Sequence, residues 1–306
     1  MSLLDQVVRL SLPVIPKPII WAIAKRYVAG SELPAALERI RAIRKEGFGT
    51  ILDVLGEGVV DAGEAAAALA EYELALSELP EVDPTTTVSV KPTHLGATND
   101  QAACVRMLSQ LCSRAADQGR RVRLEMEGSE TIDVTLGVFR EVRASHANLG
   151  CVLQSRLFRT AGDAAALLSE FESLDVRLVK GIYLEPKEIA WTEPAAISRS
   201  YVELAAQLLE GGARVGFATH DSDVADACIE VARKSDLVVG DPWGRKYEFQ
   251  LLMGVRQGEA ERLRNAGHAV RIYVPYGRDW HAYTQRRLAR NPEIARHVLR
   301  ALFLRK

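Results

Sequence analysis

The sequence is poor in cysteine and has no excess charge of either sign. Its four cysteines, Cys104, Cys112, Cys151 and Cys228, are widely separated and form neither a Cys-x-x-Cys pair nor a cysteine–histidine metal spacing. We therefore expect free, buried thiols in a reducing compartment. Lys and Arg number 39 against 40 Asp and Glu, so the net charge of −1 leaves no cationic excess to neutralise a nucleic-acid backbone.

Long apolar runs and targeting signals are also lacking. The most apolar stretch, residues 7–24, is interrupted by Arg9, Lys17 and three prolines, whereas a membrane-spanning helix needs about 20 mostly apolar residues. It also lacks the basic start and small-residue cleavage site of a signal peptide. The sequence predicts a cytoplasmic protein in which this stretch packs on the rest of the chain or contacts the inner face of a membrane.

Familiar signatures of nucleotide and metal sites are missing. The chain has no Gly-x-Gly-x-x-Gly string, no P-loop and no His-x-His or His-Glu-x-x-His pair among its six histidines. We expect no metal site. A nucleotide cofactor would need a cradle of another kind.

What the sequence does contain is a regular alternation from about residue 45 onward. Short apolar or β-branched runs alternate with longer stretches of helical period. The eight runs expected to be strands are 49–56, 86–92, 121–127, 150–156, 176–183, 214–221, 247–254 and 270–277. Helices are expected at 62–79, 99–119, 131–144, 195–212 and 280–304, the last broken near Asn291-Pro292.

Eight strand–helix units in about 250 residues match the length of a closed (β/α)8 barrel of TIM type. A doubly wound open sheet is the alternative left by the pattern. We predict a single α/β domain overall, with the barrel at residues 46–306 and a helical segment at residues 1–45 packed on it. No Pro/Gly/Ser-rich linker divides the chain.

Barrel enzymes carry their active sites at the carboxyl ends of the strands. The polar residues that end the predicted strands are Lys91, Glu125, Glu127, Gln154, Lys180, Tyr183, Thr219, His220, Asp221 and Tyr273. Three chemistries remain open: metal-assisted hydrolysis by the carboxylates and His220, Schiff-base chemistry on Lys91 or Lys180, or a cofactor lying across the barrel mouth. The structural alternative is that these residues form ordinary salt bridges and solvated strand ends.

Several strings, taken together and in order, resemble the flavin-dependent proline dehydrogenases of the monofunctional bacterial type. They are VRLVKGIYLEP (176–186), FATHD (217–221), YEFQLLMG (247–254) and RIYVPYGRDWHAYTQRRL (271–288), with YVAGSELPAALERIRAIRKEGFGTILDVLGEG (27–58) and VSVKPTHLG (88–96). The resemblance implies a distorted barrel that binds FAD. It also implies oxidation of L-proline to Δ1-pyrroline-5-carboxylate, with hydride passing to the flavin and electrons then to a quinone.

The resemblance also implies roles for individual residues. Arg286 and Arg287, on the last helix, would clamp the substrate carboxylate, because a guanidinium fork fits a carboxylate with two hydrogen bonds. Lys91 would add positive charge, and Tyr183, Leu252 and Tyr273 would enclose the ring. The catalytic residues implied are Glu125 and Arg177, with Arg177 beside the reactive nitrogen of the flavin. The residues implied to contact FAD are Met126, Gln154, Val179, Lys180, Gly181, Ile182, Thr219 and His220.

Three positions depart from the family pattern. Glu125 stands where the family usually has Asp, and its implied role is to hold Lys91 by an ion pair. Ser155-Arg156 replaces a small residue followed by an aromatic one, and Arg290 replaces a Glu. Arg290 makes the last helix more cationic. Either the pocket prefers a substrate with more negative charge or with a modified ring, or Arg290 turns outward and the pocket is that of an ordinary family member.

The implied chemistry suggests partners and competing functions. A quinone acceptor lies in a membrane, so transient contact of the N-terminal segment with a membrane surface is one hypothesis. Pyrroline-5-carboxylate dehydrogenase is a plausible neighbour because the product is reactive. The alternatives are a homologous flavoenzyme acting on a proline analogue or another cyclic amino acid, and a barrel that binds a ligand without redox chemistry.

Overall fold

The computed structural model describes residues 17–234 and 246–290, and for residues 17–19, 23 and 286–290 it describes the backbone alone. Eight parallel strands form a closed barrel in the order of the chain, with β8 paired to β1. The strands are β1 Gly49–Val54, β2 Thr87–Val90, β3 Val122–Leu124, β4 Leu149–Gln154, β5 Asp175–Val179, β6 Arg214–Ala218, β7 Tyr247–Leu252 and β8 Val270–Tyr276.

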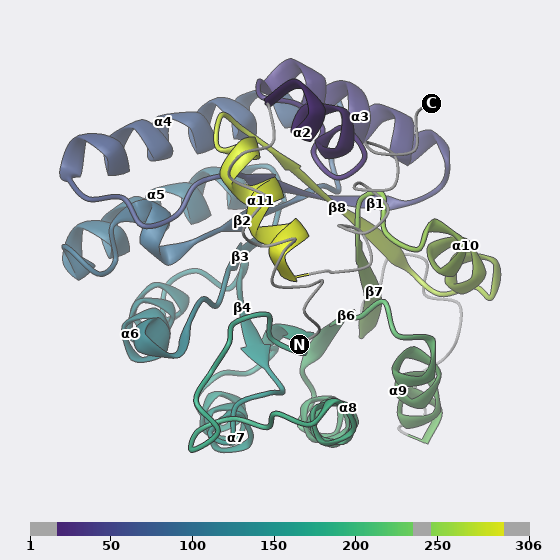
Figure 1. The fold of residues 1–306 in the computed structure, drawn as a ribbon. Helices are drawn as coiled ribbons and strands as arrows, with labels where there is room; N and C mark the ends of the chain where they lie inside the picture. Colours follow the sequence, from purple (N-terminus) through teal and green to yellow (C-terminus); the bar gives the residue numbers. More distant parts are fainter. Residues whose placement is uncertain (1–16, 235–245, 291–306) are drawn as a thin grey trace.

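Helices surround the barrel and one crosses its open end. Figure 1 shows α3 to α10 as a ring around the strands, while α11, which follows β8, lies across the mouth at the carboxyl ends of the strands. The helices are α2 Lys17–Ala24, α3 Leu33–Lys45, α4 Ala62–Glu78, α5 Gln101–Asp117, α6 Ile132–Arg143, α7 Thr160–Glu170, α8 Pro194–Glu210, α9 Ser222–Lys234, α10 Gln257–Asn265 and α11 Trp280–Arg290.

Local sequence signals define the starts of these helices. The Asp61 side chain accepts a hydrogen bond from Glu64 N at 2.9 Å, and Asp100 caps α5 by accepting from Ala103 N at 2.9 Å. Pro194 occupies the first turn of α8, where the missing N–H is not needed. Apolar helix faces then pack on the outward side chains of the strands and bury the main core between the two layers.

The interior of the barrel is charged where barrels of this type are usually filled by branched apolar layers. At the amino ends of the strands, which we call the floor, Asp175 accepts hydrogen bonds from Arg123 at 2.8 Å and Arg214 at 3.2 Å. Glu248 accepts from Arg214 at 2.6 Å and from Arg271 at 2.8 Å. These five residues are the floor cluster, and all are buried. The polar interior continues from this floor toward the mouth.

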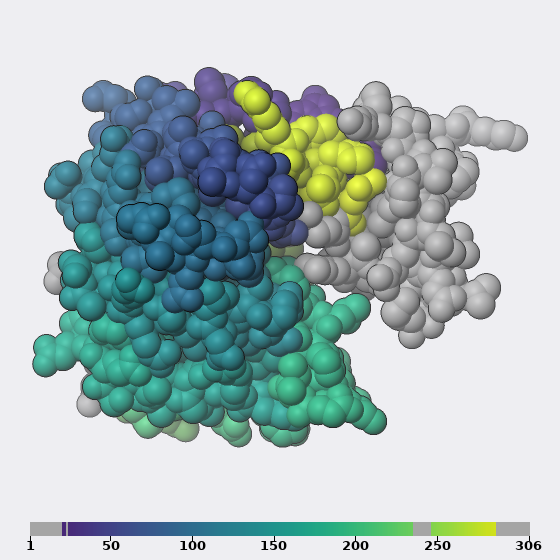
Figure 2. All heavy atoms as spheres, turned by 90° about the vertical axis from the view of Figure 1, so that its left-hand side faces the viewer, coloured from purple at the N-terminus to yellow at the C-terminus, as the bar shows by residue number. Residues whose placement is uncertain are grey.

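An N-terminal strap, residues 25–32, ties the end of α2 to the last two strands. Arg26 Nε donates to Gly254 O at 3.0 Å, and Ala29 N donates to Pro275 O at 2.8 Å. Gly277 N in turn donates to Gly30 O at 3.0 Å, just before α11 begins. Helix α2 packs on α11, and Figure 2 shows the yellow atoms of α11 on the face of the barrel that Figure 1 views. The strap therefore fixes the start of the helix that covers the mouth.

All eight predicted strands are confirmed, and the closed pairing of β8 with β1 decides for the barrel over the open sheet. The first four predicted helices correspond to α4, α5, α6 and α8, and α11 covers the start of the fifth. The structure adds α7, α9 and α10, which the pattern did not single out. The predicted stretches 1–16 and 291–304 lie outside the described residues. The four cysteines are free and buried, as expected.

Candidate active site at the carboxyl ends of the strands

Lys91, directly after β2, forms an ion pair with Asp53 on β1. Lys91 Nζ donates to Asp53 Oδ1 at 2.8 Å, and the Asp53 side chain is only 1% exposed. Burial alone would lower the pKa of Lys91, but the Asp53 carboxylate, together with Tyr72 and Glu125, outweighs burial and raises that pKa. The site therefore keeps a fixed ammonium group at the mouth of the barrel.

Arg177, on β5, is held from several strands. Its Nη1 donates to Glu125 Oε1, its Nη2 to Ser89 Oγ at 3.1 Å and its Nε to Gln250 Oε1 at 2.5 Å. The Tyr273 ring centroid lies 5.1 Å from Arg177 Cζ, a distance at which a ring face attracts a cation. Arg177 is therefore buried and held by residues of β2, β7 and β8 and by Glu125, which directly follows β3.

Glu125 joins Arg177 to Tyr273. Tyr273 OH donates to Glu125 Oε1 at 3.0 Å, the same oxygen that Arg177 contacts. Burial favours the protonated acid, but the charges of Arg177 and Lys91 outweigh it and lower the pKa of Glu125. The expectation that Glu125 holds Lys91 by an ion pair is wrong, because the hydrogen bond of the ammonium goes to Asp53. The Glu125 carboxylate is directed instead at Arg177 and Tyr273.

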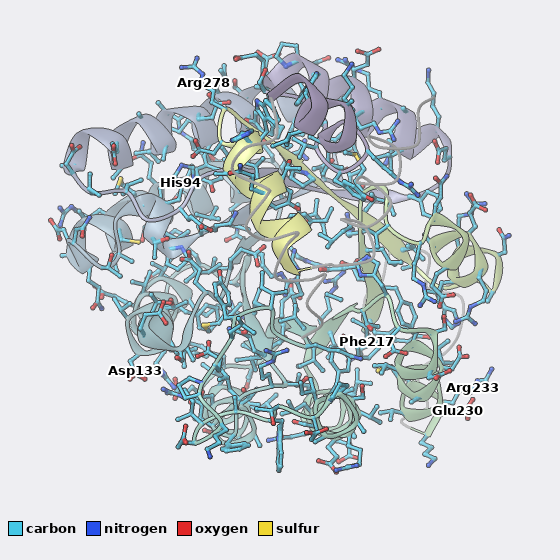
Figure 3. All side chains as sticks on the ribbon, in the orientation of Figure 1. His94, Asp133, Phe217, Glu230, Arg233 and Arg278 are labelled. Carbon is cyan, nitrogen blue, oxygen red and sulfur yellow. The ribbon has the colours of Figure 1, made fainter. Side chains whose placement is uncertain are left out.

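His94, in the segment that follows Lys91, is a partly buried histidine that contacts Tyr72. The hydroxyl of Tyr72, on α4, lies 3.4 Å from His94 Nδ1, and His94 follows Lys91 by three residues. Burial, with a smaller contribution from the charge of Lys91, lowers the pKa of His94 to about 4. Figure 3 shows His94 on the side of the barrel where α4 and α5 pack. At neutral pH this imidazole therefore adds no charge to the site.

The ends of β4 and β5 form a place where backbone can approach a flat ligand. Gln154 Nε2 donates to Glu127 O at 2.7 Å, and within the described part of the chain Gln154 Oε1 accepts no hydrogen bond. Gly181 has φ +93°, and a Cβ there would lie 2.7 Å from that oxygen. Glycine thus keeps open the space beside the free amide acceptor.

Lys180, Thr219 and His220 lie together at the ends of β5 and β6. Lys180 Nζ donates to Asp221 Oδ2 at 2.7 Å and to Ser198 Oγ at 2.9 Å. Thr219 Oγ1 accepts from Asp221 N at 3.1 Å. His220 Nε2 accepts from Leu252 N at 3.0 Å, so a neutral His220 carries its proton on Nδ1. The hydrogen bond from Lys180 is the main cause that lowers the pKa of Asp221.

The apolar and aromatic residues assigned to the site differ in exposure. Met126 is buried, whereas Ile182 is 62% exposed in the β5–α8 loop. Arg156, at one of the positions that depart from the family, donates from Nη1 to Tyr183 O at 2.7 Å. Arg156 therefore connects the segment after β4 to the loop that carries Ile182 and Tyr183.

Of the predicted substrate and catalytic residues, the structure brings Lys91, Glu125, Arg177 and Tyr273 into one set with Asp53. Arg286, Arg287 and Arg290 belong to α11, but their side chains lie outside the described residues. The carboxylates proposed for a metal hydrolase point to separate partners. Across residues 17–234 and 246–290, no cluster of three His, Cys, Asp or Glu side chains could hold a metal ion.

Sequence reasoning did not include Asp53, Ser89 and Gln250 among the candidates. Each lies inside a strand rather than at its end, within the strings ILDV, TVSV and EFQLL. The available signal was the polar side chain in an otherwise apolar run, because alternate strand residues face the barrel interior.

Comparison with known proteins identifies the family of the chain. Residues 36–300 match the proline dehydrogenase family. The proline dehydrogenase of Deinococcus radiodurans is 34% identical over 293 residues, covering 92% of this chain and 90% of that protein. Proline dehydrogenase 1 of Bacillus subtilis strain 168 is 28% identical over 279 residues, covering 91% and 90%.

Solved structures share the fold. Proline utilization A from Bdellovibrio bacteriovorus, inactivated by N-propargylglycine, superposes with a TM-score of 0.80 at 24% identity over 88% of this chain. The corresponding protein of Bradyrhizobium japonicum gives a TM-score of 0.72 at 23% identity. This chain spans about a third of the length of those solved chains, 32% and 33%. The resemblance predicted from the motifs is confirmed: the chain belongs to the proline dehydrogenase family.

Proposed function

We propose that this chain is an FAD-dependent proline dehydrogenase that oxidises L-proline to Δ1-pyrroline-5-carboxylate and passes the electrons to a quinone. The observation that carries the proposal is the meeting of two ion pairs, Lys91–Asp53 and Arg177–Glu125, beside Tyr273 at the mouth that α11 crosses. This arrangement offers fixed cations to an anionic ligand group and an aromatic wall to an apolar ring.

Lys91 and α11 support binding of the substrate carboxylate. The Lys91 ammonium is kept charged by Asp53, and α11 carries Arg286 and Arg287 in the sequence. A guanidinium binds a carboxylate through two parallel N–H bonds, which fixes both its distance and its orientation. Tyr273 and Leu252, from neighbouring strands, would then enclose the ring.

The residues at the ends of β4 to β6 fit a flavin. The free amide acceptor of Gln154 suits the N–H of a flavin pyrimidine edge, and Gly181 allows close approach of backbone. Lys180, Thr219 and His220 supply polar groups on the adjacent side. Bound FAD supplies a two-electron acceptor, which the side chains of the protein cannot provide.

In the proposed reaction, a hydride leaves the ring carbon beside the nitrogen, the nitrogen loses a proton, and a C=N bond forms. The task of the protein is orientation, because chemistry of this kind depends on holding the reacting atoms in line. Arg177 would stabilise the negative charge of the reduced flavin, as a fixed cation does at a site of developing charge. Glu125 and Tyr273 hold Arg177 for that role.

The test is an anaerobic titration of the purified protein with L-proline, followed by the visible absorbance of oxidised flavin. Bleaching would support bound flavin, hydride transfer and the substrate class together. A colourless preparation would contradict the cofactor. A yellow preparation bleached by another cyclic amino acid but not by L-proline would contradict the substrate and direct attention to Arg290.

The quinone acceptor is tested separately. Oxidation of the reduced protein by a soluble quinone, under anaerobic conditions, should restore the flavin absorbance within the time of turnover.

Among the described residues no helix is long and apolar enough to cross a membrane. Contact with a membrane surface through the apolar N-terminal residues is a further part of the proposal, because a quinone acceptor lies in a membrane. Failure of the full chain to bind liposomes at every salt concentration would contradict it.

A further inference from the structure

Gln250 connects the floor cluster to Arg177. Glu248 and Gln250 are two residues apart on β7 and so face the same side of the sheet, the barrel interior. Gln250 Oε1 accepts from Arg177 Nε at 2.5 Å, while Gln250 Nε2 donates to Glu248 Oε1 at 2.6 Å. Glu248, Gln250 and Arg177 are all buried. One amide therefore links a carboxylate on the floor to a guanidinium at the mouth.

The Glu248 carboxylate on one side and the Arg177 guanidinium on the other permit only one orientation of the Gln250 amide. Burial would raise the pKa of Glu248, but Arg214 and Arg271 outweigh it and lower that pKa to about 2, so the carboxylate is ionised. An ionised carboxylate only accepts hydrogen bonds and a guanidinium only donates them. A reversed amide would place its NH2 against the Arg177 N–H and its oxygen against Glu248. Glu248 therefore directs the Gln250 oxygen at Arg177.

The neighbouring strand is shaped to admit this amide. Gly216 on β6 lies beside Gln250, and a Cβ at Gly216 would approach Gln250 Nε2 to 2.5 Å. Such a separation is too short for a carbon and an amide nitrogen that do not bond. Any side chain at Gly216 would thus displace the amide from the position between Glu248 and Arg177.

We propose that Gln250, oriented by Glu248, is a positioning residue that sets the plane of the Arg177 guanidinium. Glu125 and Ser89 hold the two Nη atoms, and Gln250 holds the remaining Nε–H. Two of these acceptors lie on β2 and β7, and Glu125 directly follows β3. Three acceptors from three directions fix the guanidinium plane and the direction of the N–H groups that remain. This inference rests on the proposed function, because the N–H groups that remain are the ones Arg177 would present to the flavin.

Loss of the Gln250 bond is expected to change the reduction potential of the flavin rather than the binding of the substrate. A cation aligned with the site of developing charge stabilises the reduced state more than a cation that has turned away. Loss of the Gln250 bond should therefore make the flavin reduction potential more negative and slow its reduction by proline. The KM for proline should change little, since the carboxylate is bound by Lys91 and the arginines of α11.

The first variant is Gln250→Leu, compared with a matched control, Gln118→Leu. In the wild-type protein, Gln118 Oε1 also accepts from an arginine Nε, that of Arg120 at 2.7 Å, but on the floor side before β3. We expect Gln250→Leu to slow reduction of the bound flavin by roughly ten- to hundredfold. The flavin reduction potential is measured as well: each tenfold change in the equilibrium constant for flavin reduction shifts that potential by about 30 mV for a two-electron couple. The control should leave both quantities unchanged.

A second variant, Gln250→Glu, preserves packing and adds a pH signature. A protonated Glu at this position would donate to Glu248 and accept from Arg177, as Gln250 does. Ionisation would place a second carboxylate beside Glu248 and partly neutralise Arg177. The potential of Gln250→Glu should match the wild type at low pH and become more negative than the wild type as pH rises. This variant keeps the inference testable if Gln250→Leu does not fold.

A double-mutant cycle then tests the route through Arg177. In an Arg177→Lys background, adding Gln250→Leu should shift the potential no further, because the two changes remove the same interaction. The inference is overturned if Gln250→Leu binds flavin with wild-type potential and reduction rate, or if the potential of Gln250→Glu follows that of the wild type at every pH. It is also overturned if the effects of Arg177→Lys and Gln250→Leu on the potential add. The proposed function fails separately, when the wild-type protein is colourless or is not bleached by L-proline.

Discussion

Lys91 is paired with Asp53 rather than with Glu125, although both carboxylates face the barrel mouth. Glu125 instead accepts from Arg177 and Tyr273. The two carboxylates therefore serve two different cations, one assigned to the substrate and the other to the flavin. This separation predicts that their variants fail in different ways.

Asp53→Asn removes the charge that holds Lys91. It should raise the KM for proline by roughly tenfold or more, because displacement of a positioned group by about 1 Å can weaken a site up to about a hundredfold. Glu125→Gln should mainly slow flavin reduction and leave KM closer to the wild type. Steady-state kinetics and anaerobic reduction of each variant provide the measurement. Equal effects of both variants on KM would contradict the division of roles.

Trp21 anchors α11 through a ring contact with Trp280, with centroids 4.6 Å apart. Trp21→Ala should let α11 move relative to the mouth and raise the KM for proline roughly tenfold, while flavin content stays unchanged. Trp21→Phe keeps an aromatic ring at the contact and should recover most of the affinity. Loss of flavin without a change in KM would show that α2 supports a different part of the site.

Gly181 is expected to be needed for cofactor binding, and Gly162, inside α7, provides the control position. Ala at Gly181 must adopt φ +93° and place its Cβ 2.7 Å from Gln154 Oε1, so we expect about 1–3 kcal/mol of lost stability and weaker FAD binding. Gly162, inside α7, has no atom within 4 Å of the added Cβ. Gly162→Ala should stabilise the protein by roughly 0.5–1 kcal/mol. Chemical unfolding and FAD titration of both variants test the contrast.

Loss of one carboxylate from the floor cluster should lower the free energy of unfolding strongly. Glu248→Ala leaves Arg271 buried without its carboxylate partner, while Arg214 keeps only Asp175. Removal of one partner from a buried ion pair is expected to cost about 3–5 kcal/mol. Glu230→Ala breaks the exposed pair with Arg233 on α9 (Figure 3) and should cost less than about 1 kcal/mol. Urea unfolding gives both values. Similar losses for the two variants would show that the floor does not depend on ion pairing.

His94 predicts a component of the pH dependence of stability. Its pKa is lowered from 6.5 to about 4 in the folded protein, so between those values the unfolded chain binds the proton more readily. Stability should fall as pH drops from about 6.5 to 4, by on the order of 2–3 kcal/mol from this group. His94→Gln should lack that component. Parallel unfolding curves against pH for the two proteins would contradict the assigned burial.

Much of the fold could be predicted because each strand is a short apolar run bounded by turn residues, such as TTVSVKP around β2 and GCVLQSR around β4. Closure of the barrel could not be derived from those runs alone. It depends on the pairing of Ile51 with Tyr273, residues far apart in the chain. Length supplied the argument for a barrel, and the strand register decided it.

The candidate site was predicted only in part. Lys91, Arg177 and Tyr273 could be chosen because they lie in motifs that resemble the family. Asp53 and Gln250 were not chosen because they lie inside apolar strands. The partner of Glu125 was predicted wrongly because side-chain reach across a barrel is set by register and tilt, which the local pattern does not contain. The substrate clamp by Arg286 and Arg287 stays a prediction.

The bonds from the N-terminal strap to the end of β8 also bear on how the protein is made. At about 5–20 residues per second, β8 leaves the ribosome roughly 10–40 s after β1. During that interval β1 has no partner on one edge, and residues 29 and 30 have no acceptor or donor at β8. Closure of the barrel, at the mouth and at the floor alike, consequently waits for β8. A nascent chain halted before β8 should expose an open sheet edge to chaperones and bind neither substrate nor flavin.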